Sequence, residues 1–406
     1  MTAIMKGVRI LEVAEHTFVP AASALLADWG AEVIKVEHVE RGDAMRGLMS
    51  SGLAAMLNSK VHVLLEHSNR GKKSLALNLN SEAGLDVLYR LAATCDVFLT
   101  NKLPGVRAKL KIDVEHLRAH NPKIIYVRGT GHGERGPDAD RGSYDALAYW
   151  CRSGIALSMK QADEDSVPAP PGPAFGDSIG AMTIAGGIMG ALFHRERTGE
   201  ATVVDVSLLG TGLWSQGAAI ALSLQLGRPW APMPKAASTG NPLVRTYRTK
   251  DDRYISLCCL QGAKYWPGIC EVIGQPALAS DERFADAASL TKNAAVATQL
   301  LVTEFAERTA AEWRERLTSF PGQWAMVQNT LEASADPQTV ANGYVVDCQT
   351  ADGTPFKLAA APIQFDEETA IPARGPEFNE HGDAILSELG LDGDAILDLK
   401  IRGVVA

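Results

Sequence analysis

Two short apolar runs near the N-terminus, separated by a helical stretch, constrain the fold of this chain most. Residues 8–13 (VRILEV) and 31–37 (AEVIKVE) are typical of buried strands. Between them, residues 20–29 are expected to form a helix that begins with a proline and is stopped by Gly30. A strand, a helix and a second strand joined this closely form a βαβ unit with parallel strands.

The same alternation continues through the first half of the chain. Strands are expected at residues 75–79, 97–99, 124–127 and 201–206, and helices at 82–93 and 115–120. This order is the pattern of an α/β fold with a doubly wound parallel sheet.

The length of 406 residues exceeds what one ordinary core needs, so we expect two or three domains. A helical run at 208–226 is followed by a proline-rich linker at 228–234, after which a new unit begins. Its expected elements are a strand at 254–260 and helices at 266–273, 289–308 and 310–317. From residue 338 the pattern is strand-like again and ends in a helix near 377–389, so the tail could rejoin the first domain.

The composition narrows the functional class. A net charge of −9 argues against a nucleic-acid surface. The six cysteines form no CxxC spacing and the nine histidines form no HExxH, so we expect reduced thiols and no metal site. No apolar run approaches the roughly 20 residues of a membrane helix, and the first residues lack the apolar core of a signal peptide. A cytoplasmic protein without a membrane partner is expected.

An isolated acid, Asp177, lies within residues 171–180 (PGPAFGDSIG), ahead of a long stretch of small and apolar residues that ends at Gly199. The pattern predicts a helix that starts at or just after Asp177. The carboxylate is then either a helix N-cap or a functional group placed at the positive end of the helix. Residue types alone leave both readings open and favour the cap.

Two further motifs have competing interpretations. Residues 131–136 (GHGERG) match GxGxxG after a strand, but a turn-rich loop follows instead of a helix, so dinucleotide binding is disfavoured. Residues 69–74 (NRGKKS) form either a solvated turn or a phosphate clamp made by Arg70, Lys72 and Lys73.

Seven stretches of this chain occur in an informative order. They are residues 29–37 (WGAEVIKVE), 42–46 (GDAMR), 69–77 (NRGKKSLAL), 101–106 (NKLPGV), 131–137 (GHGERGP), 176–178 (GDS) and 198–201 (TGEA). Together they resemble the family III CoA-transferases, the superfamily of formyl-CoA transferase, carnitine CoA-transferase and α-methylacyl-CoA racemase.

The resemblance implies a large Rossmann-like domain, a smaller α+β domain and an obligate homodimer of two interlocked chains. The large domain would comprise residues 1–208 and 329–406, and the smaller one 234–328 after a linker at 209–233. Coenzyme A or acyl-CoA would be a substrate, with a carboxylic acid as the second substrate and no permanently bound cofactor.

The resemblance also implies a set of site residues. Asp177 would be the catalytic nucleophile, Asp145 a supporting acid, and the Gly176 amide or a glycine such as Gly240 an oxyanion donor. The residues implied at the bound CoA are Thr17, Phe18, His38, Arg46, Lys72, Lys73, Ser74, Asn101, Lys102, Lys109 and Tyr144. Asp177 would attack the acyl-CoA thioester to form an anhydride and then an aspartyl-CoA thioester, without ATP or metal.

Several positions depart from the family pattern and keep alternatives open. His38 replaces a frequent arginine, so a phosphate contact is weakened or moved. Thr17 and Phe18 replace polar residues of formyl-CoA transferase, which disfavours formyl and oxalate, and the glycine-rich loop is shortened to about residues 238–242. Tyr144 stands where the racemases carry a histidine base, so transfer is favoured over racemisation. A non-catalytic acyl-CoA-binding homologue is the third hypothesis.

Overall fold

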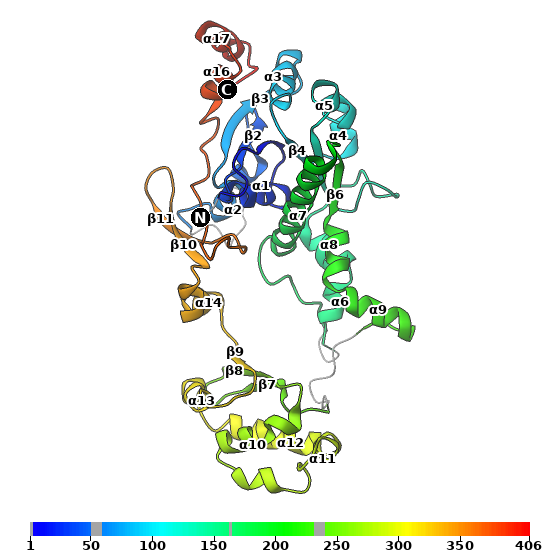
Figure 1. Cartoon of the computed structure of the whole chain (residues 1–406), viewed down its shortest axis with the longest axis vertical. Coiled ribbons are helices and arrows are strands. Elements are labelled where there is room, and N and C mark those ends of the chain that lie inside the picture. The colour runs from blue at the N-terminus through cyan, green and yellow to red at the C-terminus, as the bar shows by residue number, and fades with distance from the viewer. Residues whose placement is uncertain (1–2, 50–58, 162–164, 231–239) are drawn as a thin grey trace. The chain divides into compact units, whose positions relative to one another are not determined.

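A computed structural model describes residues 3–49, 59–161, 165–230 and 240–406 (Figure 1). The chain divides into two compact units, the first formed by residues 1–159, 166–230 and 337–406 and the second by 160–165 and 231–336. Helices α8 (Leu208–Ser215) and α9 (Gly217–Leu226) belong to the first unit, although we expected this segment to be a linker. Residues 231–239, which include parts of the expected linker and glycine loop, lie outside the described residues.

A six-stranded sheet forms the centre of the first unit, and all of its neighbouring strands are parallel. Its strands are β1 (Arg9–Val13), β2 (Glu32–His38), β3 (Lys73–Leu77), β4 (Val97–Thr100), β5 (Ile125–Thr130) and β6 (Val203–Ser207). The spatial order is β3-β2-β1-β4-β5-β6. The order reverses between β1 and β4, and in such sheets a crevice opens there beyond the carboxyl ends of the strands. The expected doubly wound parallel sheet is confirmed.

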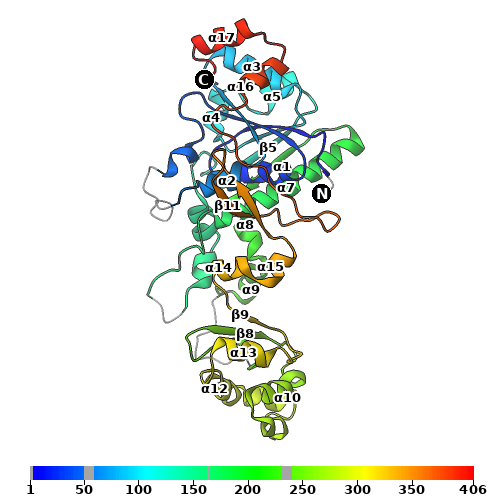
Figure 2. The same cartoon turned by 90° about the vertical axis from the view of Figure 1, so that its left-hand side faces the viewer.

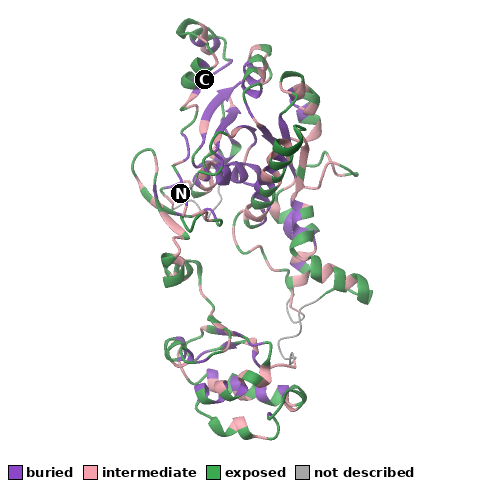
Figure 3. Ribbon diagram, viewed as in Figure 1, coloured by how far each residue is buried: buried purple, intermediate pink, exposed green. Residues whose placement is uncertain are grey.

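Helices cover both faces of this sheet because successive strand residues point to opposite sides. On one face, Ile10 of β1 packs in a cluster with α1 (Phe18–Asp28) and α7 (Phe175–Thr198). On the other, Leu11 packs in a cluster that includes residues of α3 (Glu82–Ala92) and α5 (Val114–His120). Strands β1 to β5 are largely buried, as the purple ribbon of the sheet in Figure 3 shows, whereas β6 at the edge of the sheet has no buried residue.

Helix α7 begins earlier than expected, and this changes the role of Asp177. The N-cap is Ala174, in a left-handed conformation with φ 56°, so Asp177 is the third helical residue and not the cap. The helix ends at Gly199, as expected. Its 24 residues make it the one described helix long and apolar enough to span a membrane, contrary to the expectation that no run approached this length. Its contacts with α1, β5 and β6 account for this apolar character within a folded core.

The C-terminal tail returns to the first unit. Strands β10 (Val345–Gln349) and β11 (Pro355–Ala359) pair with each other in antiparallel fashion. Helices α16 (Gly382–Glu388) and α17 (Gly393–Ile401) contribute Ile385 and Leu399 to the cluster that also contains residues of α3 (Figure 2).

The second unit contains a three-stranded antiparallel sheet and a helical layer. Its strands are β7 (Val244–Arg248), β8 (Tyr254–Cys258) and β9 (Trp324–Met326). Its helices are α10 (Gly262–Ile273), η4 (Pro276–Ser280), α11 (Ala287–Lys292), α12 (Ala294–Phe305), α13 (Ala310–Leu317) and α14 (Thr330–Ala335). Trp266, Phe305 and Trp313 are fully enclosed in its core.

Shorter elements complete the fold. They are η1 (Ala44–Met49), α2 (Val63–Asn69), α4 (Pro104–Lys109), η3 (Ala146–Arg152), α6 (Ile155–Met159) and α15 (Pro337–Ala341). Two long helices expected from sequence are each divided in two: the run 208–226 breaks at Gln216, and the run 289–308 breaks at Asn293.

Candidate active site

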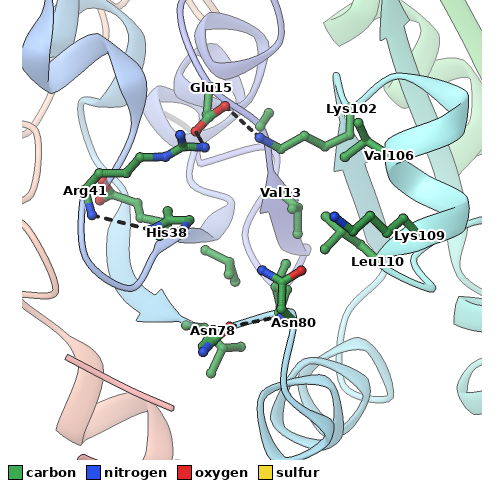
Figure 4. Close-up of a pocket in the computed structure, with 15 residues that line it drawn as sticks. Val13, Glu15, His38, Arg41, Asn78, Asn80, Lys102, Val106, Lys109 and Leu110 are labelled. Atoms are coloured by element: carbon green, nitrogen blue, oxygen red, sulfur yellow. Dashed lines mark hydrogen bonds and ion pairs between the residues drawn. The ribbon is translucent and has the colours of Figure 1, made fainter. Parts of the chain in front are cut away.

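Two adjoining pockets lie at the carboxyl edge of the parallel sheet. The first, a cavity of about 310 Å³, is lined by the ends of β1, β2 and β3 and by α4 (Figure 4). The second, about 410 Å³, lies beside the ends of β4 and β5 and includes Asp177. Glu15, Arg41, Lys102 and Val106 line both, so the two pockets form one continuous path.

Glu15 and Lys102 meet where the strand order reverses. Lys102 Nζ lies 2.6 Å from Glu15 Oε2, and the Asn101 side chain donates to the Glu15 carbonyl at 2.7 Å. The two segments follow β1 and β4, so the contacts connect the turns on either side of the switch point. These contacts hold the two turns together at the point where Glu15 and Lys102 line both pockets.

His38 shapes the turn that presents Arg41. The His38 Nδ1 accepts hydrogen bonds from the backbone N–H groups of Glu40 and Arg41, at 3.2 and 3.4 Å. The Arg41 side chain is 67% exposed, and its nearest carboxylate, Glu15, is 3.9 Å away. In Figure 4 the Arg41 side chain extends toward Glu15 at the pocket rim. Sequence reasoning overlooked Arg41, which supplies a cation beside the histidine that replaces the family's frequent arginine.

The turn before β3, which was one candidate for a phosphate clamp, lies at the amino edge of the sheet, whereas both pockets lie at the carboxyl edge. Lys73 begins β3 and pairs with Glu32, which begins β2, so both lie at the amino edge. The strand is five residues long, which separates its ends by roughly 15 Å. At the carboxyl edge, Asn78 and Asn80 follow the strand and line the first pocket.

Arg70, Lys72 and Ser74 are buried and already paired. Arg70 binds Asp28 at 2.8 Å, Lys72 Nζ lies 2.8 Å from Glu12 Oε2, and Ser74 Oγ donates to Glu37 at 2.6 Å. Burial lowers the pKa of Lys72 to about 8, although Glu12 opposes that shift. These side chains stabilise the interior, so we correct the prediction that Lys72, Lys73 and Ser74 lie around the adenosine end of a ligand. Arg46 is likewise paired, with Glu37 at 2.7 Å.

The second pocket brings together side chains from three stretches that are far apart in the sequence. Phe18 is the first residue of α1, His16 precedes it, Tyr144 belongs to the loop before η3, and Asp177 lies in the first turn of α7. The rings of His16 and Tyr144 meet edge to face, with centroids 5.6 Å apart. His16 is a second residue that sequence reasoning overlooked, and its only local signal was its place just after a strand.

The electrostatics of Asp177 differ from expectation. Burial, reinforced by the charge of Asp145, raises the pKa of Asp177 to about 7. The positive end of a helix would by itself favour the ionised carboxylate. A carboxylate that is half-buried and near a second acid is instead poised between its two protonation states near neutral pH.

The Gly176 amide, expected to serve as an oxyanion donor, is engaged in the structure. It donates to Asp145 Oδ2 at 3.2 Å. Both glycines of the first two turns of α7 make room for aromatic rings: a Cβ at Gly176 would lie 2.4 Å from the Tyr149 ring, and one at Gly180 would lie 2.3 Å from Phe18. The helix start is therefore held closely against two rings and one carboxylate.

The structure thus divides the residues expected to bind CoA. His38, Lys102 and Lys109 line the first pocket. Phe18, Asn101, Lys102 and Tyr144 line the second, together with the expected nucleophile Asp177. Thr17 is buried at the N-cap of α1 and lines neither pocket. Within the described ranges no three His, Cys, Asp or Glu side chains are grouped as a metal site requires. The arrangement is a nucleophile pocket joined to a ligand groove at the sheet edge.

The family model for CoA-transferase family III matches residues 5–382, and the chain belongs to this family. It is 28% identical to the (R)-2-hydroxy-4-methylpentanoate CoA-transferase of Clostridioides difficile, over 99% of each chain. It is also 28% identical to the cinnamoyl-CoA:phenyllactate CoA-transferase of Clostridium sporogenes, over 98% of this chain and 96% of the relative. The crystal structure of a CaiB/BaiF family protein from Brucella suis matches with a TM-score of 0.80 and 28% identity, over 96% of this chain and 100% of that one.

Proposed function

We propose that this protein transfers CoA from an acyl-CoA thioester to a carboxylic acid, with Asp177 as the covalent nucleophile. The observation that carries the proposal is the position of Asp177 in the second pocket, which is continuous with the groove at the switch point of the sheet. A ligand with a nucleotide at one end and a thioester at the other matches such a path. Family membership supports CoA transfer as the reaction class.

In the proposed reaction, a carboxylate oxygen of Asp177 adds to the thioester carbonyl and the CoA thiolate leaves, which forms a mixed anhydride. The thiolate then attacks the aspartyl carbonyl, releases the donor acid and leaves an aspartyl-CoA thioester. The acceptor carboxylate attacks that thioester, and CoA returns to the new acyl group by the reverse sequence. The thioester's free energy is retained in each covalent intermediate.

Arg41 and Lys109 are the proposed phosphate contacts of CoA. Both line the first pocket and are exposed, whereas Lys72 is paired in the interior. The asparagines after β3 lie on the same groove and offer hydrogen-bonding groups to a nucleotide. Arg41 lies at the junction of the two pockets, where a diphosphate between nucleotide and thioester would pass.

An apolar acid is the proposed acyl group. Phe18, Leu208 and Tyr144 line the pocket around Asp177. The two relatives are named for 2-hydroxy-4-methylpentanoate and phenyllactate, both acids with an apolar side chain. We propose that this protein uses an acid of that class, in preference to formate or oxalate.

The proposed assembly is an interlocked homodimer in the cytoplasm. Trp214 of α8 and Leu224 of α9 are 87% and 77% exposed in the single chain, and Leu226 is also exposed. Apolar residues exposed together on two consecutive helices favour burial against a partner. Sedimentation at several concentrations tests this, and a stable monomer would contradict it.

The decisive experiment is mass spectrometry of the enzyme with an acyl-CoA and hydroxylamine. We expect a hydroxamate on Asp177 and exchange of CoA between acids, both lost in Asp177→Ala and retained in the control Asp394→Ala, an exposed acid of α17. Turnover by Asp177→Ala would exclude the covalent mechanism. A 2-methylacyl-CoA incubated in D₂O distinguishes racemisation, since rapid α-deuteration would support that alternative. A pure acyl-CoA binder would give no hydroxamate.

A further inference from the structure

His16 has a backbone conformation that is unfavourable for its residue type. Its φ is 67°, in the left-handed region that favours glycine. Histidine enters this region more readily than most residues, but the conformation is still unfavourable for a residue with a Cβ atom. Such conformations persist where the surrounding structure enforces them, and they concentrate at functional sites.

A buried carboxylate enforces this conformation. Asp43 Oδ1 accepts a hydrogen bond from the His16 backbone N–H at 3.0 Å, and its Oδ2 lies 2.7 Å from Lys35 Nζ. Lys35 is itself enclosed and also pairs with Glu12 at 2.9 Å. Burial alone would raise the pKa of Asp43, but Lys35 outweighs it and the pKa is lowered. The turn after β1 is thus held by an ionised group inside the core.

The imidazole that this turn presents is available to a ligand. It lines the same pocket as Asp177 and is steadied by the edge-to-face contact with Tyr144. In the part of the chain that the structure describes, its ring nitrogens make no hydrogen bond. An imidazole N–H in such a position can donate to a developing negative charge.

The reaction at Asp177 requires a hydrogen-bond donor. Two groups expected near the reacting carbonyl, the Gly176 amide and Thr17, do not offer a free donor in the pocket. The Gly176 amide is hydrogen-bonded to Asp145, and Thr17 is buried outside the pocket. Each attack in the proposed sequence moves an electron pair onto a carbonyl oxygen, which becomes an oxyanion until the leaving group departs. Preorganised donors at that oxygen are among the largest contributions to acyl-transfer rates.

We propose that the His16 imidazole donates a hydrogen bond to the oxyanion formed at the carbonyl that reacts with Asp177. The inference rests on the proposed CoA-transferase function. As the Asp177 carboxylate adds to the thioester, the N–H of His16 holds the oxyanion, which then collapses and expels the CoA thiolate. His16 neither gains nor loses a proton overall. It would be a catalytic residue contributed by the strained turn after β1.

The variant His16→Gly removes the imidazole and should not destabilise the fold, so it tests the proposal directly. Glycine accepts φ 67° without strain, so the variant should be at least as stable as the natural protein. We expect kcat to fall by about 100-fold with little change in KM, as for the loss of one oxyanion donor. Added imidazole should restore part of kcat in His16→Gly, because it can occupy the space of the lost ring.

Glu367→Gly is the matched control. Glu367 is an exposed residue with φ 60° that lies outside both pockets, so its replacement should leave kcat unchanged. An unchanged kcat in His16→Gly would overturn the proposal. A loss of kcat that added imidazole does not restore would also overturn it, because it would assign a structural role to the turn. A 100-fold loss confined to Tyr144→Phe would assign the donor to Tyr144 instead. Absence of CoA transfer in the natural protein would reject the proposed function itself. Failure of the function is thereby distinguished from failure of the role proposed for His16.

Discussion

Asp145 accepts a hydrogen bond from the backbone N–H of Gly176 at 3.2 Å, one residue before the nucleophile candidate Asp177. The same carboxylate accepts from its neighbour Ala146 at 2.7 Å. Asp145 therefore acts in two ways at the start of α7. It fixes the backbone of the first turn, and its charge helps to raise the pKa of Asp177 after the larger effect of burial.

This relationship predicts the pH dependence of activity. Because the pKa of Asp177 is about 7 and only its ionised form attacks, kcat/KM should rise with pH and level off above neutrality. Asp145→Asn removes the like charge but keeps a side-chain oxygen for the Gly176 amide, so the rising limb should move to lower pH. The measurement is kcat/KM from pH 5 to 9 for both proteins. An identical limb in the variant would show that Asp145 does not influence Asp177.

The placement of β3 predicts which cations bind the ligand. Arg41→Ala should raise KM for acyl-CoA by roughly 10-fold, the scale of one charged hydrogen bond, with kcat little changed. Lys73→Ala should leave KM unchanged, because Lys73 pairs with Glu32 at the opposite edge of the sheet. Steady-state kinetics with a single acyl-CoA compare the two. A larger increase in KM for Lys73→Ala than for Arg41→Ala would support the phosphate clamp at residues 69–74 instead.

The contact between α1 and α7 predicts a steric requirement at Gly180. A methyl group at this position would lie 2.3 Å from the Phe18 ring, which lines the pocket with Asp177. Gly180→Ala should destabilise the fold by about 1–3 kcal/mol and lower kcat by displacing that ring. Gly190→Ala is the control, since a Cβ there meets no atom within 4 Å. Urea unfolding and kcat measured together test the pair, and equal effects of both variants would refute the steric argument.

The buried charges predict unequal roles for two lysines. Lys35 lies between Asp43 and Glu12, whereas Lys72 contacts only the second of these carboxylates. Lys35→Met should cost about 3–5 kcal/mol in the free energy of unfolding, because it leaves a buried carboxylate without its cation. Lys72→Met should cost clearly less, since Glu12 keeps Lys35 as a partner. Denaturant unfolding at neutral pH measures both, and a greater loss for Lys72→Met would contradict this reading of the network.

Much of the fold could be predicted because its signals are local. The alternation of short apolar runs with helical stretches, and stops such as Gly30 and Gly199, predicted the parallel strands and the end of α7. The prediction failed at helix breaks and helix starts that have no strong signal in the local sequence. The run 208–226 has continuous helical character, yet the chain turns at Gln216. The start of α7 was misplaced because Ala174, which seldom adopts a positive φ, occupies the cap.

Of the residues expected at the site, Asp177 and Tyr144 line a pocket, whereas Lys72 and Ser74 are buried in the interior, and the reason for the difference is geometric. Composition cannot tell whether a lysine beside a strand points into solvent or into the core. The direction of a parallel strand does tell which edge its flanking turns occupy, and this rule would have favoured Asn78 over Lys73.

The sequence by itself determined the parallel sheet, the family and the identity of the nucleophile candidate, because these depend on periodicity and on the order of short motifs. Only the tertiary structure decided the environment of Asp177, the engagement of the Gly176 amide and the presence of His16 in the pocket. Burial, like-charge proximity and hydrogen-bond occupancy are properties of segments that are distant along the chain and adjacent only after folding. Asp177 is therefore a carboxylate whose location is encoded locally and whose pKa and partners are set by the whole fold.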